Sequence, residues 1–128
     1  MDRTELLNQF DLTGRTAIIT GGSRGIGRAI AGGFAALGVN VVIASRKADA
    51  CAAAADEINA AGGSAIGVAA HLGRLEDGPV VIEAAVEAFG GIDIVVNNAA
   101  NALAQPLGGI TPEAVSYTHL TLPTSDLV

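Results

Sequence analysis

Four short apolar runs alternate along the chain with segments of helical periodicity, and this alternation limits the folds that the chain can adopt. The runs contain consecutive apolar residues instead of alternating apolar and polar ones, as is typical of strands covered on both faces. Parallel strands are joined by crossover connections that are usually helical and right-handed. The sequence therefore predicts an α/β fold, a doubly wound parallel sheet with strands at residues 16–20, 39–45, 64–70 and 92–98.

The three connecting segments predict helices, each with one apolar face toward the sheet. Gly38 follows the first helix and Gly90 and Gly91 follow the third, where glycine suits a left-handed cap. The second helix, roughly residues 47–61, is rich in alanine. The predicted apolar faces are Ile26, Ile30, Phe34 and Leu37 in the first helix, Cys51, Ala54, Ile58 and Ala61 in the second, and Leu75, Ile82, Val86 and Phe89 in the third.

The charges are distributed unevenly. The net charge of −6 argues against a nucleic-acid or anionic-membrane binder, because such surfaces require clustered cations. Between Leu12 and Ala48, however, there are five cations and no acid, whereas the rest of the chain has two cations and thirteen acids. This segment is where a small polyanion would bind, unless the placement of these surface charges is due to chance.

Composition excludes several other classes. The single cysteine, Cys51, rules out an internal disulfide and a cysteine-rich zinc site, so no metal site is predicted and Cys51 is interpreted as a small apolar residue. No apolar run reaches the roughly 18 residues that a membrane span requires. The first ten residues are too polar for a secretory signal, so a cytoplasmic location is predicted.

A glycine-rich segment, residues 20–27 with the sequence TGGSRGIG, directly follows the first predicted strand and leads into the first helix. Glycines there let a diphosphate approach the backbone, and the unpaired amides at the helix N-terminus point toward it. The order of strand, glycine-rich turn and helix therefore predicts a nucleotide site.

This segment resembles the T-G-x-x-x-G-x-G loop of the short-chain dehydrogenase/reductase family, and NNAA at residues 97–100 resembles that family's N-N-A-G. Ala100 departs from the usual glycine. The likeness covers about residues 10–114, which implies the N-terminal part of a Rossmann-type sheet, truncated after the fourth strand. Residues 115–128 are predicted to be a non-native tail, because residues 115–124 are the translation of DNA resembling the end of a transposase-based sequencing adapter.

The residues after the second strand predict which dinucleotide binds. A carboxylate there would accept hydrogen bonds from the adenosine ribose and repel a 2′-phosphate, but Ser45 occupies that place. Arg46 follows it, and Arg24 lies in the glycine-rich loop. Basic residues at both positions resemble the NADP-preferring members of the family, so NADP(H) is predicted over NAD(H). The alternative for Arg46 is a solvated cation at a helix start.

Other positions are assigned by the resemblance. His71 and Leu72 stand where the family has an aspartate and an apolar residue near the adenine, although a loop histidine can also simply be exposed. Asn97 would contact the cofactor ribose, Asn98 would join neighbouring strands, and Thr20 would be a structural hydrogen-bonding residue more than a ligand. The predicted cofactor-binding residues are Gly21, Ser23, Arg24, Gly25, Ile26, Gly27, Ser45, Arg46, His71, Leu72, Asn97 and Ala99.

No catalytic residue is predicted within the chain. The family uses a serine, a helix asparagine and a tyrosine whose pKa is lowered by a lysine four residues later, but Tyr117 is followed at that spacing by Thr121, and Lys47 is the only lysine. The resemblance therefore implies an inactive, NADP(H)-binding fragment whose intact parent would be a homo-oligomer that interconverts carbonyls and alcohols. The alternatives are a non-catalytic dinucleotide-binding or redox-sensing module and an inert half-domain.

Overall fold

The computed structural model describes residues 1–98, so Ala99, Ala100 and the predicted tail at 115–128 lie outside the described residues. Helices and strands alternate along the described part, with one short 3-10 turn before the last helix. The elements are α1 (Arg3–Asn8), β1 (Thr16–Thr20), α2 (Gly25–Ala36), β2 (Asn40–Ser45), α3 (Ala48–Ala60), β3 (Ser64–Ala69), η1 (Leu75–Asp77), α4 (Gly78–Phe89) and β4 (Ile94–Val96).

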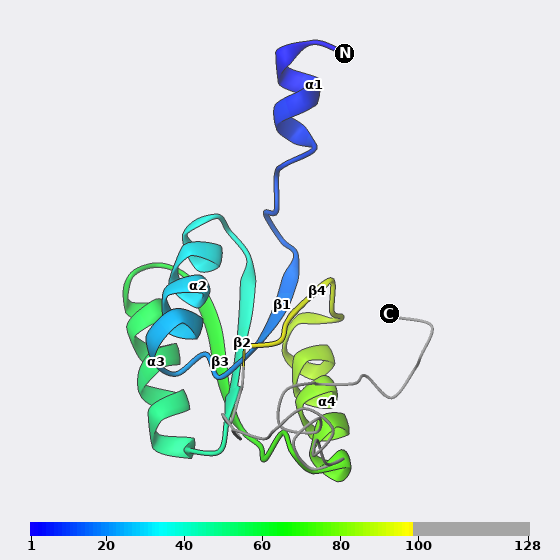
Figure 1. Ribbon diagram of the computed structural model, residues 1–128. Coiled ribbons are helices and arrows are strands. Elements are labelled where there is room, and N and C mark those ends of the chain that lie inside the picture. The colour runs from blue at the N-terminus through cyan, green and yellow to red at the C-terminus, as the bar shows by residue number, and fades with distance from the viewer. Residues whose placement is uncertain (99–128) are drawn as a thin grey trace, which may run out of the picture.

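The strands form one parallel sheet in the order β3-β2-β1-β4. Helices α2 and α3 cover one face of this sheet and α4 covers the other (Figure 1). The predicted α/β class and the doubly wound arrangement are therefore confirmed. The register pairs Ile18 of β1 with Val42 of β2 and Val95 of β4, so β1 lies between these two strands.

The core consists of two clusters, one on each side of the sheet. Alternate residues of β1 point to opposite layers: Ala17 and Ile19 join the cluster under α2 and α3, whereas Ile18 joins the cluster under α4. Because both faces are covered, all five residues of β1 are buried. This explains why the strand contains consecutive apolar residues.

The predicted helix faces were partly wrong. Ile26 of α2 and Leu37, the residue just after its end, are 75% and 58% exposed, and the α2 residues buried against the sheet are Gly27 and Ala31. Ile30 and Phe34 are partly buried beside them. Small residues occupy the contact because they let the helix approach the sheet closely, and the larger side chains lie at its margins.

The third predicted helix shows the same displacement. Leu75, in η1, is 89% exposed and Val86 of α4 is 48% exposed, while Val81 and Ala85 face the core. In α3, Cys51, Ala54 and Ile58 are buried as expected and Ala55 joins them, but Ala61 lies beyond the helix end and is exposed. The caps agree better with expectation: Gly38 and Gly90 have φ of 84° and 86°.

Helix α1 was not predicted. A capping box forms it: the backbone N–H of Glu5 donates to the Asp2 carboxylate at 2.8 Å, and that of Asp2 donates to Glu5 at 3.1 Å. None of its residues is buried, and it stands clear of the sheet (Figure 1). Within residues 1–98, no helix has the length and hydropathy needed to cross a membrane.

Candidate functional site

The glycine-rich loop lies where β1 ends, at the carboxyl edge of the parallel sheet. Gly21 has φ of 65° and Gly25 has φ of 58°, a left-handed backbone conformation that favours glycine. The Gly21 N–H donates to the carbonyl of Ala44 in β2 at 2.8 Å, which fixes the start of the loop to the neighbouring strand. The loop therefore turns from the buried strand into α2 with its backbone held in place.

Gly27 is required by a close contact. A Cβ at this position would lie 2.3 Å from the Gly21 carbonyl oxygen and 2.6 Å from Nδ2 of Asn98. That Nδ2 group donates to the same Gly21 carbonyl at 3.3 Å. The absence of a side chain on Gly27 thus allows α2, the loop and the segment after β4 to meet.

Thr20 and Asn98 join the neighbouring strands β1 and β4, so Asn98 ties two strands together and Thr20 has a structural hydrogen-bonding role, as expected. The Thr20 hydroxyl donates to the Val96 carbonyl at 3.3 Å, and its oxygen accepts from the Asn98 backbone N–H at 2.9 Å. These bonds hold the ends of β1 and β4 together beside the loop. Asn97, next to Asn98, is exposed at this edge.

The N-terminus of α2 suits an anion. Arg24 occupies the N-cap position in an extended conformation, no side chain caps the helix, and its first turn contains no acid. The first-turn amides of a helix have no acceptor within the helix, and the helix dipole places partial positive charge there. Space beside Gly25 is open, since a Cβ built on it meets nothing within 4 Å. These features fit the diphosphate of a dinucleotide.

The two predicted specificity arginines are both exposed at this edge. Arg24 follows Ser23 in the loop, and Arg46 follows Ser45 at the end of β2. The Ser23 and Ser45 hydroxyl oxygens are 3.4 Å apart, so the two segments are in contact. Neither guanidinium makes an ion pair with another group in residues 1–98, unlike Arg28, which binds Glu57 at 3.1 Å.

The segment after β3 contains the other predicted contacts. His71 is half-buried: its backbone N–H donates to the Asp77 carboxylate at 2.7 Å, and its Nδ1 accepts from the Gly73 N–H at 3.2 Å. Leu72 packs against the core cluster on the α4 face. His71 therefore takes part in the turn before η1, which is a structural role that the sequence did not reveal.

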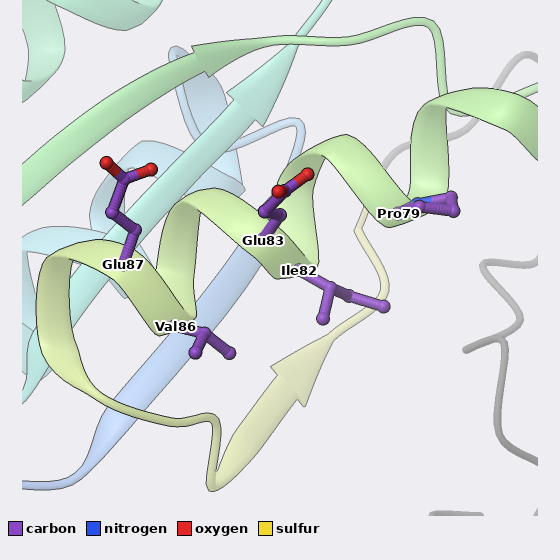
Figure 2. A pocket seen from close by; sticks show the side chains of 5 residues that line it. All are labelled: Pro79, Ile82, Glu83, Val86 and Glu87. Atoms are coloured by element: carbon purple, nitrogen blue, oxygen red, sulfur yellow. The ribbon is translucent and has the colours of Figure 1, made fainter.

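A shallow groove elsewhere on the surface does not belong to this site. It runs along α4 and is lined by Pro79, Ile82, Glu83, Val86 and Glu87, none of which was predicted to bind cofactor. Figure 2 shows Ile82 and Val86 on one side of the helix and the two glutamates on another. Residues 1–98 also contain no group of histidine, cysteine and acidic side chains that could hold a metal ion.

Comparison with known proteins agrees with this geometry. The family profile described as short chain dehydrogenase matches residues 15–119. An uncharacterized oxidoreductase of Mycobacterium tuberculosis is 45% identical over 95% of this chain and 42% of its own length. L-rhamnose 1-dehydrogenase (NAD(P)(+)) of Azotobacter vinelandii is 48% identical over 69% of this chain and 36% of its own.

A solved structure shares the fold. The crystal structure of a metagenomic short-chain oxidoreductase in complex with NADP superposes with a TM-score of 0.71 and 35% identity, covering 84% of this chain and 49% of that one. The chain thus spans less than half the length of these relatives. With a family match over most of its residues, the chain belongs to the short chain dehydrogenase family, whose oxidoreductases bind a nicotinamide dinucleotide.

Proposed function

We propose that this chain binds NADP(H) in preference to NAD(H), with the diphosphate at the amides of residues 21–27 and the 2′-phosphate between Arg24 and Arg46. The observation that carries the proposal is the pair of exposed guanidinium groups, free of ion pairs within residues 1–98, on two segments in contact through Ser23 and Ser45. The name of one relative includes NAD(P)(+), and a similar crystal structure contains NADP.

The energetic argument favours the phosphorylated cofactor. A hydrogen bond between a charged donor and a charged acceptor contributes about 1.5–3 kcal/mol, so two arginine contacts would give a large preference. Residues 12–48 contain no acid whose negative charge would oppose phosphate binding. The acid nearest to Arg46 along the chain is Asp49, in the first turn of α3. Ser45, in the place where a carboxylate would repel the 2′-phosphate, leaves the position neutral.

For the whole protein we propose NADP-dependent interconversion of a carbonyl and an alcohol. The bound cofactor supplies or accepts hydride in that reaction. Within residues 1–98, backbone amides would hold the diphosphate, and the two arginines would select a cofactor with a 2′-phosphate on its adenosine ribose. Asn98 fixes the glycine-rich loop to the segment after β4. The predicted contacts at Ile26, His71, Leu72 and Asn97 remain part of this proposal, and Ala99 lies outside the described residues.

Cofactor titration tests the binding proposal. We expect the chain to bind NADPH more tightly than NADH, measured by the fluorescence of the reduced cofactor or by calorimetry. Arg24→Ala and Arg46→Ala should each weaken NADPH binding about tenfold or more, since loss of 1.4 kcal/mol is a factor of ten, and should change NADH binding much less. Arg3→Ala, which removes an equal charge from α1, is the matched control. Equal or tighter binding of NADH by the wild-type chain would reject the proposal.

A further inference from the structure

Ser45 is the point where the glycine-rich loop, β2 and α3 meet. Its hydroxyl oxygen lies 3.4 Å from the Ser23 hydroxyl, 3.0 Å from the Cys51 sulfur and 3.3 Å from the backbone N–H of Lys47. All three distances fall within hydrogen-bonding range for these atoms. The side chain therefore connects three segments through one oxygen.

Hydrogen-bond accounting gives the direction of each bond. A serine hydroxyl has one proton to donate and two lone pairs to accept with. The Lys47 N–H can only donate, and it uses one lone pair. The Ser23 hydroxyl donates to the second lone pair of the Ser45 oxygen. The Ser45 proton is then directed to the Cys51 sulfur. The thiol proton of Cys51 can be donated to the carbonyl of Ser45 at 3.8 Å or to that of Val68 at 3.7 Å.

The sulfur is a fixed anchor for this network. Cys51 is 1% exposed, and α3 is pressed against β3 at this level. A Cβ on Gly67 of β3 would lie 2.6 Å from the Cys51 backbone carbon, so the helix and strand are as close as glycine allows. The position of the Cys51 thiol is therefore set by backbone packing rather than by a flexible side chain.

The network links the two arginines of the proposed cofactor site. Ser23 immediately precedes Arg24, and Ser45 immediately precedes Arg46. The contact between the two hydroxyls therefore constrains the separation of the backbone segments that carry both guanidinium groups. Cys51 fixes the Ser45 end of that contact from behind, inside the core.

We propose that the Cys51–Ser45–Ser23 hydrogen-bond chain is a positioning device that sets the spacing of Arg24 and Arg46 and thereby the preference for a 2′-phosphorylated dinucleotide. Cys51 acts through Ser45 and is a positioning residue. This inference rests on the proposed NADP(H) binding. It predicts that a buried change in α3, remote from solvent, alters discrimination between two cofactors that differ by one phosphate.

The test uses the full chain and titrates NADPH and NADH against each variant. We expect Cys51→Ala to reduce the ratio of NADPH to NADH affinity about threefold or more, while Cys51→Ser, which keeps an acceptor for the Ser45 proton, restores most of it. Ile58→Val removes a methylene from a buried position about two turns further along α3 and should leave the ratio unchanged. A ratio that is unaltered in Cys51→Ala, or altered equally in Ile58→Val, would overturn the inference.

A double-mutant cycle separates this inference from the proposed function. Cys51→Ala should change the affinity ratio in the wild-type background but not in Ser45→Ala, because the two residues act through one bond. The same cycle, measured by urea unfolding without cofactor, should show that the two substitutions are coupled. Coupling in unfolding without any preference for NADPH in the wild type would refute the proposed function, whereas a preference without coupling would refute the positioning role.

Discussion

Gly27 and Gly33 lie on the same helix, but a side chain would meet very different surroundings at each. A Cβ on Gly27 would collide with the Gly21 carbonyl, which belongs to backbone and cannot rotate away, whereas a Cβ on Gly33 meets nothing within 4 Å. We expect Gly27→Ala to destabilise the fold by about 1–3 kcal/mol, as overpacking usually does, and to weaken NADPH binding.

Gly33→Ala is the matched control for that substitution. Since alanine is favoured over glycine in a helix, it should stabilise the chain by up to about 1 kcal/mol. Urea unfolding of the two variants beside the wild type measures both effects. If Gly27→Ala unfolds at the same urea concentration as Gly33→Ala, the close contact among Gly21, Gly27 and Asn98 is wrong.

The Asp11 carboxylate accepts two hydrogen bonds from Thr13. The hydroxyl of Thr13 donates to its carboxylate at 2.7 Å and the Thr13 backbone N–H at 2.9 Å, and in that order these bonds lower the pKa of Asp11 below its ordinary value of 3.8. Since the pKa is lower in the folded state, this contribution to stability is present above the ordinary pKa and is lost as the pH falls through the lowered one.

We expect Thr13→Ala to raise the pKa of Asp11 toward the ordinary value, because only the backbone donor remains. A carboxyl-carbon NMR titration of the wild type and the variant follows the protonation of Asp11 directly. An Asp11 titration that is the same in both proteins would contradict the assigned hydrogen bond.

At the level of elements, a side chain from α3 caps one edge of the sheet formed by residues 1–98. In the sheet that residues 1–98 form, β3 is an edge strand, and Asn59 from the end of α3 binds the backbone groups of its Ala65: Nδ2 donates to the Ala65 carbonyl at 3.0 Å, and Oδ1 accepts from the Ala65 N–H at 2.8 Å. The side-chain amide thus takes the place of a further strand, which protects the edge.

Removal of this amide should be costly. Asn59→Ala leaves both backbone groups of Ala65 without their partner, and we expect a loss of about 1–3 kcal/mol in unfolding free energy. Asn59→Asp keeps the acceptor, so its unfolding free energy should fall between those of the wild type and Asn59→Ala. Asp56→Ala, at an exposed position of the same helix, is the control. Chemical denaturation that ranks Asn59→Ala with Asp56→Ala would disprove the edge-capping role.

How much could be read from the sequence differed between element types. Strands β1 to β3 were located to within one residue at each end, because burial on both faces produces apolar runs with clear limits. β4 is shorter than predicted, with Ile92 and Asp93 before it and Asn97 and Asn98 after it. Helix faces were less certain, since alanine and glycine carry little hydrophobic signal even where they make the contact with the sheet.

In the candidate site, local backbone positions could be predicted from the sequence, whereas long-range side-chain contacts could not. Positions on the loop follow from glycine spacing, which backbone geometry enforces, and so Gly21, Gly25 and Gly27 lie where the pattern indicated. Contacts between side chains far apart in sequence, such as Asn98 with Gly21, depend on the packing of the whole sheet. The only indication of the Ser45–Cys51 contact in the sequence is a hydroxyl and a thiol six residues apart on either side of the start of α3.

At the scale of the whole molecule, the exposed side of β4 in the sheet formed by residues 1–98 leads to a prediction about association in solution. Within residues 1–98, β4 pairs only with β1, and its three apolar residues are half-buried. Because unprotected apolar edges template strand pairing between chains, we expect the chain to associate in a concentration-dependent manner. Sedimentation velocity over a range of concentrations measures this. A single monomeric boundary at all concentrations, together with a cooperative thermal transition, would show that the edge is protected.

Helix α1 has a practical consequence. It precedes β1 and contributes no buried residue, whereas the glycine-rich loop follows the other end of the same strand (Figure 1). A chain immobilised on a sensor surface through its N-terminus would therefore present the proposed nucleotide edge to the flowing solution, with the first ten residues acting as a spacer.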